Sequence, residues 1–188
     1  TKFSTNGDSK YTKSFGGPED DFVNQIKATA TGIYIVGTFG SSIDLDPGID
    51  IAKKTGTSPQ NKNAYLSFLN SDGIYSWAKT FNSDLFSEIV GISLTNNKIL
   101  LTGNFAMSTN FNPDDITGDF KTTDSNGSIF VTRLDTLTPT LTATESGGTT
   151  VILPLSMSDN IELRLSARPL SDAKINFSSN DGSLVFSP

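Results

Sequence analysis

The chain of 188 residues contains an internal repeat with a 66-residue period, and this repeat restricts the folds open to it. Residues 11–15 (YTKSF) match residues 77–81 (WAKTF), and the same shift places residues 37–39 (GTF) on residues 103–105 (GNF). Three further matches keep the same order: Asn6-Gly7 with Asp72-Gly73, residues 44–48 with residues 110–114 and, one residue short of the shift, residues 64–69 with residues 129–134. Ordered matches at one spacing indicate two copies of one structural unit.

Each copy predicts several short strands, which indicates an all-β fold. The first copy, at about residues 10–75, predicts strands at 22–28, 32–39 and 64–69, and a fourth at 74–81 beyond a turn. The second copy, at about residues 76–135, predicts counterparts at 88–94, 98–105 and 129–134. We expect the long segments 40–63 and 106–128 to be loops. Short strands at a fixed period are typical of propeller blades, so residues 1–135 predict two propeller-type antiparallel β-repeats.

The composition changes after residue 135, where the repeat does not restart. Residues 136–142 predict a linker or an entering strand, and further strands are predicted at 149–155, 161–167, 172–177 and 184–188. Apolar and polar residues alternate strictly in the run that begins at Ile161. Since a complete immunoglobulin-like sandwich needs about seven strands and about 100 residues, residues 136–188 predict a partial, Ig-like β-sandwich.

The composition excludes several classes of function. The chain has no His and no Cys, which excludes a Ser-His-Asp triad, a thiolate nucleophile and a Cys-ligated zinc site. Its formal net charge of −6 disfavours nucleic acid as a partner, because such binding depends on contacts to phosphates. No run approaches the roughly 20 apolar residues of a membrane-spanning helix. We therefore expect a protein that is not an enzyme, with a structural or binding role.

Calcium is the one cofactor that the sequence suggests. Asp44 and Asp46 in the first copy, and Asn112 and Asp114 in the second, lie in matching segments and could supply the oxygen ligands that Ca²⁺ prefers. The alternative is that these side chains cap backbone groups in turns, and the sequence leaves both interpretations open. The acidic run at residues 19–21 indicates a solvated loop before a strand rather than a catalytic carboxylate pair.

The motifs of residues 3–135 resemble the bacterial β-propeller repeats called SBBP repeats. The resemblance rests on residues 15–22 (FGGPEDDF), 32–39 (GIYIVGTF), 44–48 (DLDPG), 64–73 (AYLSFLNSDG) and 77–79 (WAK). The second copy departs from this pattern where Asn82-Ser83 replaces Gly16-Gly17. The resemblance implies a scaffold without an assigned reaction, in an exported or cell-surface protein.

Residues 144–149 (TESGGT), 163–169 (LRLSARP) and 172–177 (DAKINF) are similar to the first half of a Calx-β-type or related bacterial Ig-like repeat. This second resemblance implies a sandwich that is truncated or that a partner completes.

Taken together, these patterns predict a non-enzymatic, extracytoplasmic structural or adhesive protein, extracellular or associated with the bacterial cell surface or outer membrane. The alternative is a module that binds a carbohydrate or a host matrix protein through the long segments 40–63 and 106–128. A closed propeller needs at least about four blades, whereas the chain holds two copies and, at residues 3–15, the tail of a preceding one. We therefore expect protein partners or self-assembly to supply further blades.

Overall fold

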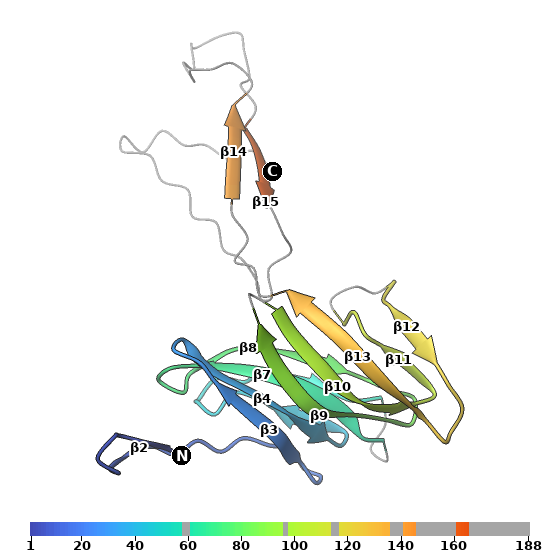
Figure 1. The fold of residues 1–188 in the computed structure, drawn as a ribbon, viewed down its shortest axis with the longest axis horizontal. Helices are drawn as coiled ribbons and strands as arrows, with labels where there is room; N and C mark the ends of the chain where they lie inside the picture. The colour runs from blue at the N-terminus through green and yellow to red at the C-terminus, as the bar shows by residue number, and fades with distance from the viewer. Residues whose placement is uncertain (58–60, 96–97, 114–116, 136–140, 146–160, 166–188) are drawn as a thin grey trace. The chain divides into compact units, whose positions relative to one another are not determined.

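The computed structural model describes residues 1–57, 61–95, 98–113, 117–135, 141–145 and 161–165. The described residues form antiparallel β-sheets and contain no helix, which confirms the predicted all-β class. The chain divides into two compact units, Thr1–Thr136 and Leu137–Pro188. The first unit contains both repeats (Figure 1).

The first sheet has four strands in the order β3-β4-β7-β8, which is also their order along the chain. They are β3 (Phe22–Ala28), β4 (Gly32–Phe39), β7 (Asn63–Asn70) and β8 (Tyr75–Phe81), and every neighbouring pair is antiparallel. The two central strands carry the densest apolar runs, as expected for strands with covered faces. The strands predicted for the first copy are therefore present.

The second sheet repeats the first three strands of this arrangement in the order β9-β10-β13. They are β9 (Phe86–Thr95), β10 (Lys98–Ala106) and β13 (Ser128–Asp135), again antiparallel. Among the described residues, no fourth strand pairs with the outer edge of β13, where β8 pairs with β7 in the first sheet. The second sheet is thus open on the side that is closed in the first.

Each segment predicted as a long loop contains a short hairpin, so the loop prediction is wrong at these residues. The hairpins are β5 (Ser42–Asp44) with β6 (Lys53–Thr55), and β11 (Ser108–Asn110) with β12 (Phe120–Thr122). Strands of three residues are too short for a clear alternation of apolar and polar side chains. The two hairpins occupy matching places in the two repeats.

The N-terminal hairpin has the strand pairing found at the end of the first repeat. It pairs β1 (Lys2–Phe3) with β2 (Ser9–Tyr11), with Lys2 opposite Tyr11 and an irregularity directly after Lys2. In the first sheet, Phe68 of β7 lies opposite Trp77 of β8, and the same irregularity follows Phe68. Lys2 and Phe68 are 66 residues apart, as are Tyr11 and Trp77. The backbone pairing therefore repeats with the period of the sequence, and the irregularity repeats with it.

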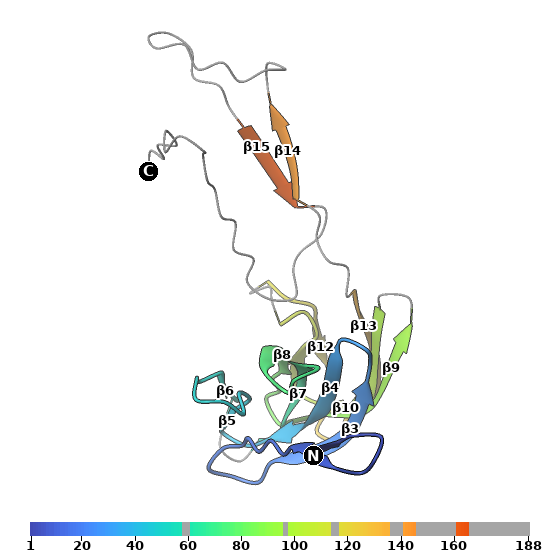
Figure 2. The ribbon, with the colours of Figure 1, turned by 90° about the vertical axis from the view of Figure 1, so that its left-hand side faces the viewer.

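The two sheets pack face to face, and β9 carries the contact by lying against β3, β4 and β7. We name the side of each sheet that bears Ala64 and Leu66 of β7, or Ile129 and Val131 of β13, its trailing face. In Figure 2 the first sheet lies between the β5–β6 hairpin and β9. The trailing face of the first sheet therefore meets the second sheet, and Ala64 and Leu66 are fully buried.

The opposite side of each sheet, which we name its leading face, carries the hydrophobic core of its repeat. In the first sheet, Phe39, Tyr65 and Ala78 on this face pack against Ile43 and Leu45 from the β5–β6 hairpin. The hairpin thus covers the sheet that contains β4 and β7, the strands that precede and follow it in the chain. In the second sheet, Phe105, Phe111 and Phe130 form the matching cluster.

The C-terminal unit contains one described pair of strands. They are β14 (Leu141–Glu145) and β15 (Ile161–Leu165), antiparallel with Leu141 opposite Leu165. Strand β15 lies within the strand predicted at 161–167. The strands predicted at 149–155, 172–177 and 184–188 lie outside the described residues.

The packing between the sheets can be tested with two isoleucines that occupy the same position in the two repeats. Ile92 on β9 is 5% exposed at the interface, and its equivalent Ile26 on β3 is 56% exposed. We expect Ile92→Ala to lower the free energy of unfolding by about 2–5 kcal/mol and Ile26→Ala to change it by less than about 0.5 kcal/mol. Urea denaturation at low protein concentration measures both values. Equal losses in the two variants would contradict the described packing.

Candidate functional site at the open end of the second sheet

Within residues 1–135, no described element covers the trailing face of the second sheet, and this face carries large apolar side chains. Ile129 is 81% exposed and Val131 is 76% exposed. Their equivalents in β7 are Ala64 and Leu66, which the second sheet buries completely. Monomeric proteins usually protect an edge strand with charges, bulges or a covering loop, so an uncovered edge with two large aliphatic residues indicates an interaction surface.

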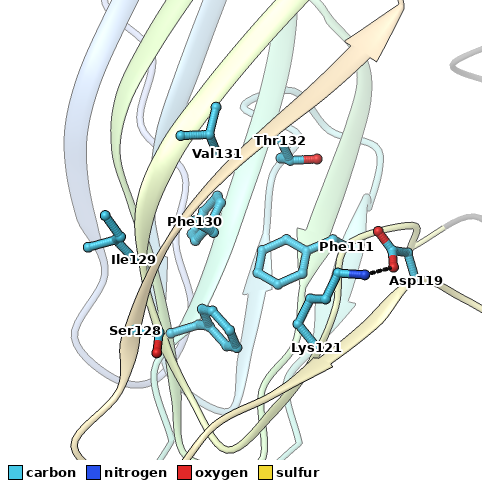
Figure 3. A pocket seen from close by; sticks show the side chains of 9 residues that line it. Phe111, Asp119, Lys121, Ser128, Ile129, Phe130, Val131 and Thr132 are labelled. Atoms are coloured by element: carbon cyan, nitrogen blue, oxygen red, sulfur yellow. Dashed lines mark hydrogen bonds and ion pairs between the residues drawn. The ribbon is translucent and has the colours of Figure 1, made fainter.

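A groove of about 340 Å³ lies between β13 and the β11–β12 hairpin. Its floor is aromatic, with ring centroids of Phe111 and Phe130 4.7 Å apart and those of Phe111 and Phe105 5.2 Å apart. An ion pair between Lys121 and Asp119 stands at its rim. Figure 3 shows Ile129 pointing away from this groove, to the other side of β13.

The first repeat shows what fills such a groove. Leu45 and Tyr65 occupy the positions equivalent to Phe111 and Phe130, and there Ala78 of β8 belongs to the same core cluster. The groove of the second repeat is therefore the place that a fourth strand takes in the first. An unpaired strand edge beside an apolar groove is the arrangement by which proteins accept an added β-strand.

The other end of the repeat pair is uncovered in a complementary way. On the leading face of the first sheet, Val23 is 58% exposed and Ile26 is similarly exposed. Their equivalents Ile89 and Ile92 are buried where β9 packs on the first sheet. Among the described residues, the repeat pair thus exposes at its two ends the same two kinds of surface that it buries at the junction of its sheets.

Asp21 stands at this uncovered end with one carboxylate oxygen unsatisfied. Its Oδ2 accepts a hydrogen bond of 2.6 Å from the backbone N–H of Gly17, whereas its Oδ1 is buried without a partner among the described residues. Burial raises the pKa of Asp21, and the neighbouring Glu19 and Asp20 raise it further, against the lowering effect of the Gly17 hydrogen bond.

Ser87 occupies the position of Asp21 in the second repeat and shows what a satisfied group does there. Its Oγ accepts a hydrogen bond of 2.9 Å from the backbone N–H of Ala64 and donates to the carbonyl of Phe81. It therefore ties the start of β9 to two strands of the first sheet. Asp21 has the equivalent place at the start of the first repeat, where the described residues that precede it form only the two-stranded β1–β2 hairpin.

The residues predicted to bind calcium lie in two separate hairpins. Oδ1 of Asp44 accepts from the backbone N–H groups of Asp46 and Ala52 at 3.1 and 2.9 Å, and Oδ1 of Asp46 accepts from Gly48 at 2.6 Å. Asn110, the equivalent of Asp44, accepts from Asn112 and from Asp119 at 2.9 and 3.0 Å.

These hydrogen bonds are the backbone-capping role that the sequence left open as the alternative to calcium. Asp114 lies outside the described residues. The described part of the chain contains no group of three or more acidic residues placed to hold a metal ion. Calcium binding stays a prediction for Asp44, Asp46, Asn112 and Asp114.

Reasoning from the sequence missed the open groove and the two uncovered faces. The available signal was the match between residues 64–69 and 129–134, combined with the absence of a WAKTF-like segment after residue 135. That combination places a third strand at residues 129–134 without its fourth. It also places Ile129 where the first repeat has the smaller Ala64.

Comparisons with protein-family models, with curated proteins and with solved structures find no match to this chain. No helix in the described ranges is long and apolar enough to cross a membrane.

Substitution of Asp44 separates the capping role from calcium binding. We expect Asp44→Ala to lower the free energy of unfolding by about 1–3 kcal/mol, because two backbone N–H groups lose their acceptor. Asp44→Asn should be nearly neutral, since Asn110 plays the same part in the second repeat. Denaturation without calcium measures both. An Asp44→Ala variant as stable as the unmodified chain would contradict the capping role, and calorimetric heat on adding Ca²⁺, lost in Asp46→Ala, would support the metal site.

The raised pKa of Asp21 predicts a pH-dependent effect on stability. Burial disfavours the charged carboxylate, so its contribution to stability is largest when it is protonated and is lost as the pH rises through the raised pKa. Asp21→Asn removes the charge, and we expect it to raise the melting temperature at pH 7 but not at pH 3. Thermal unfolding at both pH values provides the measurement. A gain that is the same at pH 3 and pH 7 would refute the electrostatic cause.

Proposed function

We propose that this chain is a non-enzymatic repeat scaffold of an extracytoplasmic structural or adhesive protein on a bacterial surface. In this proposal each repeat is a propeller-type blade of the SBBP kind, and residues 136–188 add a partial Ig-like β-region. The observation that carries the proposal is the interface between the sheets, where one repeat buries the apolar face of the next. Repeats that depend on their neighbours in this way build extended scaffolds.

The polar side chains of the repeats support the same proposal. Asp44 and Asn110 hold the two hairpins, and Ser87 joins the two sheets. Asn63, which is fully buried, donates to the carbonyl of Gly40 and accepts from the N–H of Ser83. These groups stabilise the backbone at the junctions between elements, as expected for side chains with a structural role.

Locating the protein in the organism that produces it tests this proposal. We expect cell fractionation with an antibody against the chain to find it outside the cytoplasmic membrane, and external protease to remove it from intact cells. Recovery of the protein in the cytoplasmic fraction, with resistance to external protease, would refute the extracytoplasmic scaffold.

A second candidate function is the binding of a host matrix protein or a carbohydrate, and the tip of the β5–β6 hairpin favours it. Ile49 is fully exposed there, and Ile51 is mostly exposed. Two exposed aliphatic side chains on one tip are typical of a contact with a protein, so within this candidate they favour the matrix protein.

Arrays of matrix proteins and glycans probe the second candidate. Dose-dependent binding that an Ile49→Ser, Ile51→Ser double variant weakens by tenfold or more, a loss of about 1.4 kcal/mol, would support recognition. Binding to no array component, or binding that the variant leaves unchanged, would reject the hairpin as the recognition site.

A further inference from the structure

We propose that a second molecule of this chain docks its first repeat on the open end of the second repeat, in the geometry of the interface inside the chain. The inference rests on the proposed scaffold function and names its partner. The trailing face with Ile129 and Val131 would meet the leading face with Val23 and Ile26 of the other molecule. At the internal interface, the equivalent positions of both faces are buried, so docking continues an interface that already exists.

Asp21 supplies a polar argument that is independent of the apolar faces. Inside the chain, Ala64 of β7 lies between the neighbouring strands β4 and β8, but its N–H donates to the side chain of Ser87. Ile129 is the equivalent of Ala64, and Asp21 is the equivalent of Ser87. Docking in the same geometry places the N–H of Ile129 against the carboxylate of Asp21 from the other molecule. Because Oδ1 is covered by its own molecule, it accepts this hydrogen bond only when the Asp21 side chain turns toward the docked β13.

The same docking places a strand of the second molecule in the groove beside β13. Residues 11–15 of the docked molecule are equivalent to residues 77–81 of β8, so they would lie along β13 as its fourth strand. Thr12 then takes the place of Ala78, against Phe111 and Phe130. This pairing supplies hydrogen-bonding partners to the open edge of β13.

The docked strand must exchange one partner for another. Lys2 and Phe3 of β1 occupy the repeat position of Arg133 and Leu134 in β13, so both pairs claim the same edge of β2. The β1–β2 pairing involves only two residue pairs, and β1 is exposed. Replacement of β1 by the longer β13 gains ladder contacts for both molecules.

Two differences between the repeats predict that this contact is weaker than the internal interface. Asn24 and Gln25 of the first repeat reach across to β9, where they bond the carbonyl of Ile89 at 2.8 Å and the N–H of Ile92 at 2.7 Å. The second repeat has Val90 and Gly91 at these positions, so it offers neither hydrogen bond. We therefore expect reversible association, and Val90→Asn should strengthen it.

Because the docked surfaces differ from one another, the contact is head-to-tail and each molecule keeps one open end until a ring closes. Two molecules supply four repeats, which is about the smallest number of blades in a closed propeller. Mixing variants distinguishes this association from a dimer in which the same face of both molecules meets.

Sedimentation velocity of the full chain, from about 1 µM to about 100 µM, tests the proposal. We expect the unmodified chain to associate as its concentration rises. Val23→Asp and Ile129→Asp, each at an exposed position, should be monomeric alone because a charge would be buried at one docking face. Their equimolar mixture should form a heterodimer, since each variant retains the face that the other lacks. Circular dichroism and melting temperature verify that both variants fold.

Val90→Asn is the variant that distinguishes specific docking from non-specific hydrophobic association. It replaces a half-exposed apolar residue by a polar one, which would reduce non-specific association. By restoring the equivalent of the Asn24 hydrogen bond, it should instead tighten docking by about threefold to tenfold.

Several results would overturn the proposal: a monomer at about 100 µM, association that persists in both aspartate variants, a mixture that stays monomeric, or weaker association in Val90→Asn. A monomeric chain found on the cell surface would reject docking alone and leave the open end to another partner. A self-associating chain confined to the cytoplasm would reject the proposed function alone.

Discussion

The structure depends on the burial of sheet faces between successive repeats. A sheet of this chain has apolar residues on both faces, and its own hairpin covers only one of them. The other face is buried because the next repeat lies on it, as Ala64 and Leu66 show in the first sheet. Burial of apolar area is the main favourable contribution to folding, so a repeat of this kind gains much of its stability from its neighbour.

The same constraint explains the positions of the polar groups. Ser87 and Gln25 bond backbone groups across the junction of the two sheets, and Asp44 and Asn110 fix the hairpins that cover the leading faces. An interior polar group is costly unless it is hydrogen-bonded. Asp21 has one of several buried polar atoms without a partner among the described residues, and its place in the repeat belongs to a junction that these residues do not complete. Burial within its own repeat is the main cause of its raised pKa.

The sequence was sufficient to predict most strands of residues 1–135, because the repeat aligned two independent versions of each apolar run. It was insufficient for the hairpins: three residues such as Ser42–Asp44 show no period, and their pairing depends on hydrogen bonds to Asp44. It also could not show which face of β13 is uncovered, since Ile129 reads as an ordinary core residue in a strand. Exposure there is a property of the sheet order.

Native-state hydrogen exchange tests most directly whether burial between the repeats holds the structure together. We expect the protected amides of β4 and β7 in the first sheet and of β9 and β10 in the second to exchange through one cooperative opening with a single free energy. Two well-separated free energies, with the second sheet opening while the first stays fully protected, would contradict it.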